Sequence, residues 1–259
     1  MTTLDIPLVF LGQAGFRLDF DGVVVFVDPY LSDRVEKMEG PELRRLRPVP
    51  FLPESVTDAN YILVTHGHMD HCDPESILPM LQSSPMAMVV GPGEVIAALV
   101  AQGMARERGI VLSDDPFVVN PDLRFIPLPA AHPQVERDTD GHLRCLGFVV
   151  EFRGKRIYHS GDTSPDELTI GILRDLAPID VALLPINEKN FYRDKAGIIG
   201  NMSIREAFGM AEDMAAKVMV PMHYDMFKAN QAYLDELAVV YRELQPPFAL
   251  LIEPDRLAL

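Results

Sequence analysis

At residues 65–71 the chain reads Thr65-His66-Gly67-His68-Met69-Asp70-His71, which places four potential metal ligands within six residues. Imidazole suits borderline divalent cations, and a carboxylate adds negative charge and can bridge two ions. If the backbone stays extended, His66 and His68 point to the same side, and Asp70 and His71 can then turn toward a neighbouring position. Three histidines beside an aspartate are difficult to bury, neutral and hydrogen-bonded, without a cation. The stretch therefore predicts a metal site.

Short apolar runs indicate buried strands, and the histidine-rich stretch follows one of them. The runs cover residues 8–11, 23–27, 61–64, 86–90, 123–128, 148–152, 156–158, 181–184 and 218–220. The two runs on either side of Arg153-Gly154-Lys155 predict a hairpin.

Helices are expected between many of these runs. Residues 94–106 have helical composition and would end at Gly109. Ser164-Pro165-Asp166-Glu167 and Ser203-Ile204-Arg205-Glu206 both resemble helix starts with a capping serine, and Asn230 can cap a final helix through about residue 244. Strands followed by alternating helices and strands predict a mixed α/β domain.

Further ligand-type residues follow other predicted strands. His132 comes after the run 123–128, Asp162 after the run 156–158, and His223 after the run 218–220. Loops at the carboxyl ends of strands are where α/β folds usually assemble their sites. Of seven histidines, only His142 and His159 lie outside this set. The sequence thus predicts one site built from several strand ends.

Bulk composition favours one domain spanning residues 1–259, since there is no repeat, linker or low-complexity tract. No apolar run approaches the about 20 residues of a membrane span, and the amino terminus does not resemble a signal peptide. Cys72 and Cys145 are expected to be free thiols, which makes the cytoplasm the expected location. The net charge of -15 disfavours nucleic acid and anionic membrane surfaces as partners, while a local basic pocket for a small anion stays compatible with it.

The ligand pattern resembles the signature of the metallo-β-lactamase fold superfamily, on the following residues: His66, His68, Asp70, His71, His132, Asp162 and His223. The resemblance implies a four-layer αββα sandwich with a two-metal site along one edge. It implies that His66, His68 and His132 hold one ion, that Asp70, His71 and His223 hold the second, and that Asp162 bridges them. Histidine at position 68, where the redox di-iron branch has glutamate, favours hydrolysis.

Further motifs resemble the L-ascorbate-6-phosphate lactonase-like group. They are Leu11-Gly12-Gln13-Ala14-Gly15-Phe16, Asp28-Pro29-Tyr30-Leu31-Ser32-Asp33, Tyr158-His159-Ser160-Gly161-Asp162-Thr163, Pro185-Ile186-Asn187, Ile199-Gly200-Asn201-Met202 and Pro221-Met222-His223-Tyr224-Asp225-Met226-Phe227. This resemblance implies opening of a lactone of a small anionic sugar derivative, phosphorylated ones included, and assembly into homo-oligomers. Histidine and carboxylate ligands fit one or two ions of manganese, zinc or iron, and the resemblance favours manganese.

Metal-bound hydroxide would be the nucleophile at neutral pH. Asp70, beside both ions, is expected to orient it. His159 is a candidate proton donor to the leaving group, with support of Asp162 as the equal alternative. Asp28 is expected either to support a ligating histidine or to serve as a turn residue before Pro29. Cys72 is expected to be a small buried thiol and not a ligand.

Substrate-binding residues are expected in the long segment between the run 181–184 and Ser203, because such loops commonly cover sites. The candidates are Asn187, Lys189, Tyr192, Arg193, Lys195 and Asn201, together with Tyr224 after His223. The cations among them could hold a phosphate or carboxylate, and a solvated loop is the alternative interpretation.

Two other functions stay open at this stage. One is phosphodiesterase or phospholipase-like hydrolysis in the same dinuclear site, with nuclease activity the weakest enzyme option given the charge. The other is a metal-binding protein without turnover, which the complete ligand set disfavours. A small-molecule substrate is the partner that all enzymatic readings share.

Overall fold

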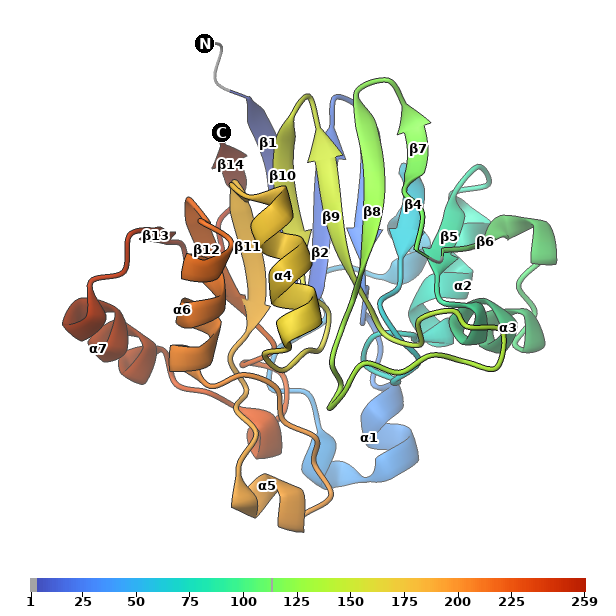
Figure 1. The fold of residues 1–259 in the computed structure, drawn as a ribbon. Coiled ribbons are helices and arrows are strands. Elements are labelled where there is room, and N and C mark those ends of the chain that lie inside the picture. Colours follow the sequence, from blue (N-terminus) through green and yellow to red (C-terminus); the bar gives the residue numbers. More distant parts are fainter. Residues whose placement is uncertain (1–3, 113) are drawn as a thin grey trace.

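Two mixed β-sheets pack face to face in the computed structural model, which describes residues 4–112 and 114–259 (Figure 1). The first sheet has the strand order β14 (Arg256–Ala258), β1 (Asp5–Gly12), β2 (Gly15–Phe20), β3 (Val23–Val27), β4 (Ala59–Leu63), β5 (Met88–Gly91) and β6 (Gly109–Val111). The second has the order β13 (Ala249–Leu250), β12 (Val218–Met222), β11 (Val181–Pro185), β10 (Lys155–His159), β9 (Leu146–Phe152), β8 (Leu123–Pro129) and β7 (Phe117–Asn120).

Each sheet combines an antiparallel half with a parallel half. In the first sheet β14 to β3 pair antiparallel, and β3 to β6 pair parallel. In the second sheet β7 to β10 pair antiparallel, and β10 to β13 pair parallel. The predicted hairpin is β9 and β10, with Lys155 opposite Phe152. Parallel strands need crossover connections, which explains the alternating helices.

Helices cover the outer faces of the sheets (Figure 1). On the first sheet lie α2 (Pro74–Ser83) and α3 (Gly93–Ala101), and on the second lie α4 (Glu167–Leu176), α6 (Ile204–Asp213) and α7 (Leu234–Leu244). The short helices α1 (Arg34–Glu39) and α5 (Phe191–Lys195) lie together at the lower end of the sandwich in Figure 1. In the described part of the chain, 3-10 turns complete the elements: η1 (Pro41–Leu43), η2 (Pro53–Ser55), η3 (Arg106–Arg108) and η4 (Lys228–Asn230).

The core consists of three apolar layers, and strand β9 shows how the sequence specifies them. Phe148, Val150 and Phe152 face the layer between the two sheets, while Val149 packs in the layer under α4 and α6. Successive side chains of a strand point to opposite faces, so a strand that is apolar throughout must be covered on both sides. A third layer joins the first sheet to α2 and α3. The predicted four-layer αββα sandwich is therefore confirmed.

Helix boundaries depart from the sequence prediction at three places. Asp166, not Ser164, caps α4, because its carboxylate accepts hydrogen bonds from the backbone of Leu168 and Thr169. Asn230 lies in η4 and does not cap α7, which begins at Leu234, and α3 ends at Ala101. The capping box at Ser203 and Glu206 is confirmed. Within the described part of the chain, no helix has the length and apolar character needed to cross a bilayer.

Candidate metal centre

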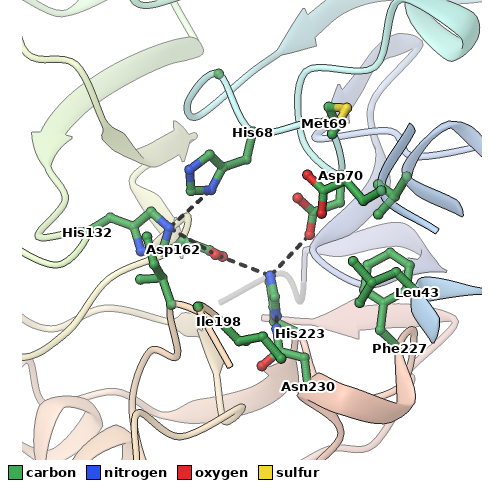
Figure 2. Close-up of a pocket in the computed structure, with 15 residues that line it drawn as sticks. Leu43, His68, Met69, Asp70, His132, Asp162, Ile198, His223, Phe227 and Asn230 are labelled. Carbon is green, nitrogen blue, oxygen red and sulfur yellow. Dashed lines mark hydrogen bonds and ion pairs between the residues drawn. The ribbon is translucent and has the colours of Figure 1, made fainter. Parts of the chain in front are cut away.

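Seven ligand-type side chains converge at one edge of the sandwich, from the loops that follow β4, β8, β10 and β12. Figure 2 shows those that line a cavity at this edge: His68, Asp70, His132, Asp162 and His223. The seven side chains form two groups, within each of which the ligand atoms lie no more than 4.8 Å apart. One group consists of His66, His68, His132 and Asp162, and the other of Asp70, His71 and His223. The structure therefore brings together every residue of the predicted ligand set.

Asp162 joins the two groups. Its Oδ1 lies 3.3 Å from Nε2 of His71, and its Oδ2 lies 3.2 Å from Nε2 of His223 and 3.7 Å from Nε2 of His132. The second group is tied together by Asp70, whose Oδ2 lies 3.5 Å from Nε2 of His223. Figure 2 traces this continuous line of contacts from His68 through Asp162 to Asp70. A carboxylate in this position can contact two cations at once.

Several buried polar atoms of this cluster lack a hydrogen-bond partner among the described residues. They are Nε2 of His66, Nε2 of His71, Nδ1 of His132 and Oδ1 of Asp162. Leaving a buried polar atom unsatisfied costs about 1–3 kcal/mol, so a native fold retains such a cluster only where something else satisfies it. Imidazole nitrogens and carboxylate oxygens aimed at one another are a donor set that divalent zinc, manganese or iron accepts. The residues fit a divalent metal.

The other ring nitrogens of two histidines are held by Asp28 and Thr65. Nδ1 of His71 lies 2.7 Å from Oδ2 of Asp28, which is fully buried. The Thr65 hydroxyl donates to the same oxygen and lies 3.0 Å from Nδ1 of His66. With Nδ1 engaged, each ring turns Nε2 toward the cluster. Asp28 thus contacts a histidine of the cluster directly and is more than a turn residue.

Electrostatics at the cluster favour positive charge. Burial alone would raise the pKa of Asp162, but His223 and His71 outweigh it and hold the pKa well below its usual range. Burial alone would lower the pKa of His223, but the carboxylates of Asp162 and Asp70 raise it to about 9. Burial lowers the pKa of His132 to about 4. The carboxylates are thus ionised at neutral pH, and protons compete with metal ions for the same nitrogens.

A cavity of about 340 Å³ opens over both groups. Its floor includes His68, Asp70, His132, Asp162 and His223. Its other walls are formed by Val35, Glu39, Leu43, Gly67, Met69, Gly197, Ile198, Ile199, Phe227 and Asn230. Figure 2 shows Leu43, Ile198 and Phe227 beside the histidines and carboxylates. A small molecule can therefore reach both groups at once.

His159 does not line this cavity. Its Nε2 donates to the carbonyl of Ala14 across 2.8 Å, and its Nδ1 accepts from the N–H of Gly161 across 3.1 Å. Both ring nitrogens are thus committed to the backbone, and the contact with Gly161 positions the residue that precedes Asp162. This arrangement agrees with the supporting role and leaves no free proton donor at His159.

The predicted substrate-binding residues are also absent from the cavity wall: Asn187, Lys189, Tyr192, Arg193, Asn201 and Tyr224. Arg193 donates to backbone carbonyls of Asn187, Glu188 and Gln231. Tyr224 is buried and lies in hydrogen-bond contact with Glu253. Segment 197–199, just beyond the predicted cations, contributes apolar side chains in their place.

Two contacts of the cluster were not singled out from the sequence. Gln13, in the turn between β1 and β2, contacts Asp70 and His223 through its side-chain nitrogen. Asn230 lines the cavity and lies 3.4 Å from Nδ1 of His223. Gln13 lies two residues after the predicted strand 8–11, which is a usable signal, whereas nothing local marks Asn230 as a site residue. Cys72 is a buried free thiol with its pKa raised to about 12 by burial, as expected of a residue that is no ligand.

Sandwich, edge site and ligand chemistry together define a protein of the metallo-β-lactamase fold. Residues 24–224 match the Beta-lactamase superfamily domain, and the chain belongs to that superfamily. A UPF0173 metal-dependent hydrolase of Rubrobacter xylanophilus is 31% identical over 245 residues, which cover 92% of this chain and 89% of the relative.

Solved structures agree on the fold. Igni18, a metallo hydrolase from Ignicoccus hospitalis, gives a TM-score of 0.70 at 21% identity and covers 99% of this chain and 98% of its own. The isothiocyanate hydrolase from Delia radicum gut bacteria gives a TM-score of 0.73 at 17% identity, with 99% of each chain covered. The comparisons support the coarser expectation of a metal-dependent hydrolase, and the two groups supply its candidate ligands.

Proposed function

We propose that this protein hydrolyses an ester bond in a small molecule, with a lactone as the first candidate. The observation that carries the proposal is the pair of histidine and carboxylate groups, joined by Asp162, on the floor of a cavity of about 340 Å³. In this proposal His66, His68 and His132 hold one divalent ion, Asp70, His71 and His223 hold the other, and Asp162 contacts both. When bound, such ions lower the pKa of a water to about 7 and polarise a carbonyl oxygen.

The side chains of this protein have distinct tasks in that chemistry. The carboxylates of Asp70 and Asp162, both ionised, would hold the positively charged metal ions at the floor of the cavity. Asp70 is 18% exposed, so it is the carboxylate that can orient a water from the cavity side. Asp28 and Thr65 hold the rings of His71 and His66 in one tautomer. The apolar wall excludes bulk water around the scissile bond, which strengthens these electrostatic interactions.

Among the described residues, no histidine that lines the cavity is a general acid independent of the two groups. His159 is committed to the backbone, and the remaining cavity histidines belong to the two groups. In a lactone the leaving oxygen stays tethered to the product, so its developing charge can be stabilised in place before water protonates it. This feature favours a cyclic ester over a substrate whose leaving group must be protonated before departure.

The test combines elemental analysis of the purified protein with an activity panel. Aliphatic lactones and bis-p-nitrophenyl phosphate are assayed with protein loaded with manganese, zinc or iron. We expect lactone opening that depends on metal and that falls by at least about 10³-fold in Asp162→Ala, since this variant loses the contact shared by both groups. Asp140→Ala, in an exposed loop, is the matched control.

Three results would contradict the proposal. Phosphodiester cleavage without lactone opening would assign phosphodiester hydrolysis, and not lactone hydrolysis, to this site. Lactone opening unchanged in Asp162→Ala would place the reaction elsewhere. Purified protein that binds none of the three metals would contradict metal-dependent hydrolysis at this site.

A further inference from the structure

We infer that the part of the substrate remote from the scissile bond is uncharged and apolar, such as an alkyl or acyl chain, and is not a phosphorylated or carboxylated group. This inference rests on the proposed function and narrows its substrate class. It follows from what the cavity walls contain above the two groups.

The wall opposite the candidate ligands is apolar and firmly packed. Val35 and Phe227 are buried at 5% and 4% exposure and form a small cluster with Tyr30 and Met226. Leu43 and Met69 pack against this cluster. Because the cluster fixes these side chains, the wall presents a preformed apolar surface, with Ile198 and Ile199 added from the segment after α5. Each methylene that moves from water to such a surface is worth about fourfold in affinity.

Charge on the cavity wall disfavours an anion. No lysine or arginine is among the residues lining the cavity in the described parts of the chain. Glu39 is the one charged wall residue outside the ligand groups, and it has no ion-pair partner among residues 4–112 and 114–259. A phosphate or carboxylate at this depth would lose hydration, gain no charge-assisted donor and be repelled by Glu39.

Three arginines near the cavity are bound elsewhere. Arg193 donates to four backbone carbonyls, those of Asn187, Glu188, Ala229 and Gln231. Arg45 donates to the carbonyls of Tyr30 and Ser32. Arg47 forms ion pairs with Asp225 and Glu253, at 2.7 and 2.6 Å. Each would have to abandon these contacts before it could hold a substrate anion.

A second cavity, which also reaches the first group, likewise lacks net positive charge from side chains. It reaches His66, His68 and His132 and is lined on its outer side by Glu94, Glu136 and Arg144, among others. Arg144 is paired with Glu94 at 2.9 Å, which leaves Glu136 in excess. Neither approach to the two groups therefore offers net positive charge from side chains.

The test uses two ligands with the same chelating head and chain length, octanohydroxamic acid and suberic acid monohydroxamate. They differ by one terminal carboxylate, and calorimetry with metal-loaded protein measures both dissociation constants. We expect octanohydroxamic acid to bind at least about tenfold more tightly, because only its chain end matches the apolar wall. Glu39→Lys should reduce that ratio several-fold, whereas Glu42→Lys, exposed on η1 outside the cavity wall, should not.

Binding is measured without turnover, so this test is independent of the lactone assay. If no lactone in the activity panel is opened, the proposed function is overturned. The hydroxamate comparison would still decide whether the cavity prefers an apolar or an anionic ligand. Equal affinities, tighter binding of the carboxylated compound, or no binding of either compound to metal-loaded protein would overturn the inference.

Discussion

The side-chain nitrogen of Gln13 donates a hydrogen bond to Oδ2 of Asp70 across 2.6 Å and lies 3.1 Å from Nε2 of His223. Gln13 is itself held through its own backbone. Its N–H donates to Oδ1 of the Asp225 side chain, and its carbonyl accepts from the N–H of His223. A turn between the first two strands thus positions two of the three residues in the second group. The amide carries no charge, so it orients Asp70 without competing for a cation electrostatically.

Replacement of Gln13 by leucine should weaken the binding of one of the two metal ions selectively. Leucine has similar bulk but no donor, so Asp70 and His223 lose the contact that aligns them. We expect the affinity for one of two ions to fall about tenfold, the lower end of the range for partners of metal ligands, while the other is retained. Titration calorimetry with elemental analysis measures both. Gln102→Leu, exposed at the end of α3, is the control, and an equal loss of both ions would contradict the assignment.

The Asp28→Asn variant tests how the rings of the site are held. Asp28 accepts from the N–H and the hydroxyl of Thr65 and contacts Nδ1 of His71. Asparagine offers only one acceptor oxygen, so these contacts cannot all survive. We expect metal affinity to fall about 10–100-fold with the circular dichroism spectrum unchanged. The control Asp140→Asn should keep the metal affinity of the wild type. If Asp28→Asn also keeps it, Asp28 does not support the metal ligands.

Much of this site could be predicted from the sequence, because its ligands occupy strand ends and strands are marked by apolar runs. His132 and His223 lie 91 residues apart, yet each follows a β-strand that ends at the same edge. The apolar runs predicted a mixed α/β domain, whereas the sandwich was implied by the family resemblance; in the structure β9 is buried on both faces, as a strand between two layers must be. The sequence did not predict strands β2, β6, β7, β13 and β14 or helices α1, α2 and α5, because they are short or interrupted by polar residues.

What the sequence could not show depends on tertiary contacts and backbone strain. Gln13, Asp28 and His223 all adopt positive φ, at 58°, 43° and 57°, a conformation that costs a non-glycine residue roughly 1 kcal/mol. Strained residues of this kind cluster at functional sites. The apolar character of the cavity wall likewise arises from Leu43 and Phe227, which are far apart in the sequence. Arg193 was expected to bind an anion because its contacts to backbone carbonyls leave no mark in the sequence.

Removal of metal should lower thermal stability. Nε2 of His66 and Nε2 of His71 have no hydrogen-bond partner among the described residues, and bound cations would supply one. A ligand at 100 times its dissociation constant stabilises a fold by about 2.7 kcal/mol. In a domain of this size 1 kcal/mol corresponds to about 2–4 °C, so each ion should raise Tm by roughly 5–10 °C. Differential scanning fluorimetry before and after chelation measures the shift. His142→Ala, outside both groups, should keep it, and Asp162→Ala should lose most of it; a shift that survives in Asp162→Ala would mean that metal binds elsewhere.

Arg193→Lys separates a structural arginine from a substrate-binding one. The guanidinium holds the backbone at residues 187–188 against residues 229 and 231, and an ammonium lacks the planar set of donors that reaches all four carbonyls. Loosening this segment should shift Ile198 and Ile199 at the cavity wall, so we expect binding of octanohydroxamic acid and of suberic acid monohydroxamate to weaken by the same factor, about two- to tenfold.

An arginine that bound a substrate anion would behave differently, because its replacement would weaken the binding of the carboxylated ligand alone. Lys195→Ala, exposed on the same helix and outside the cavity wall, is the control and should affect neither ligand. Selective weakening of suberic acid monohydroxamate in Arg193→Lys would restore an anion site to this segment.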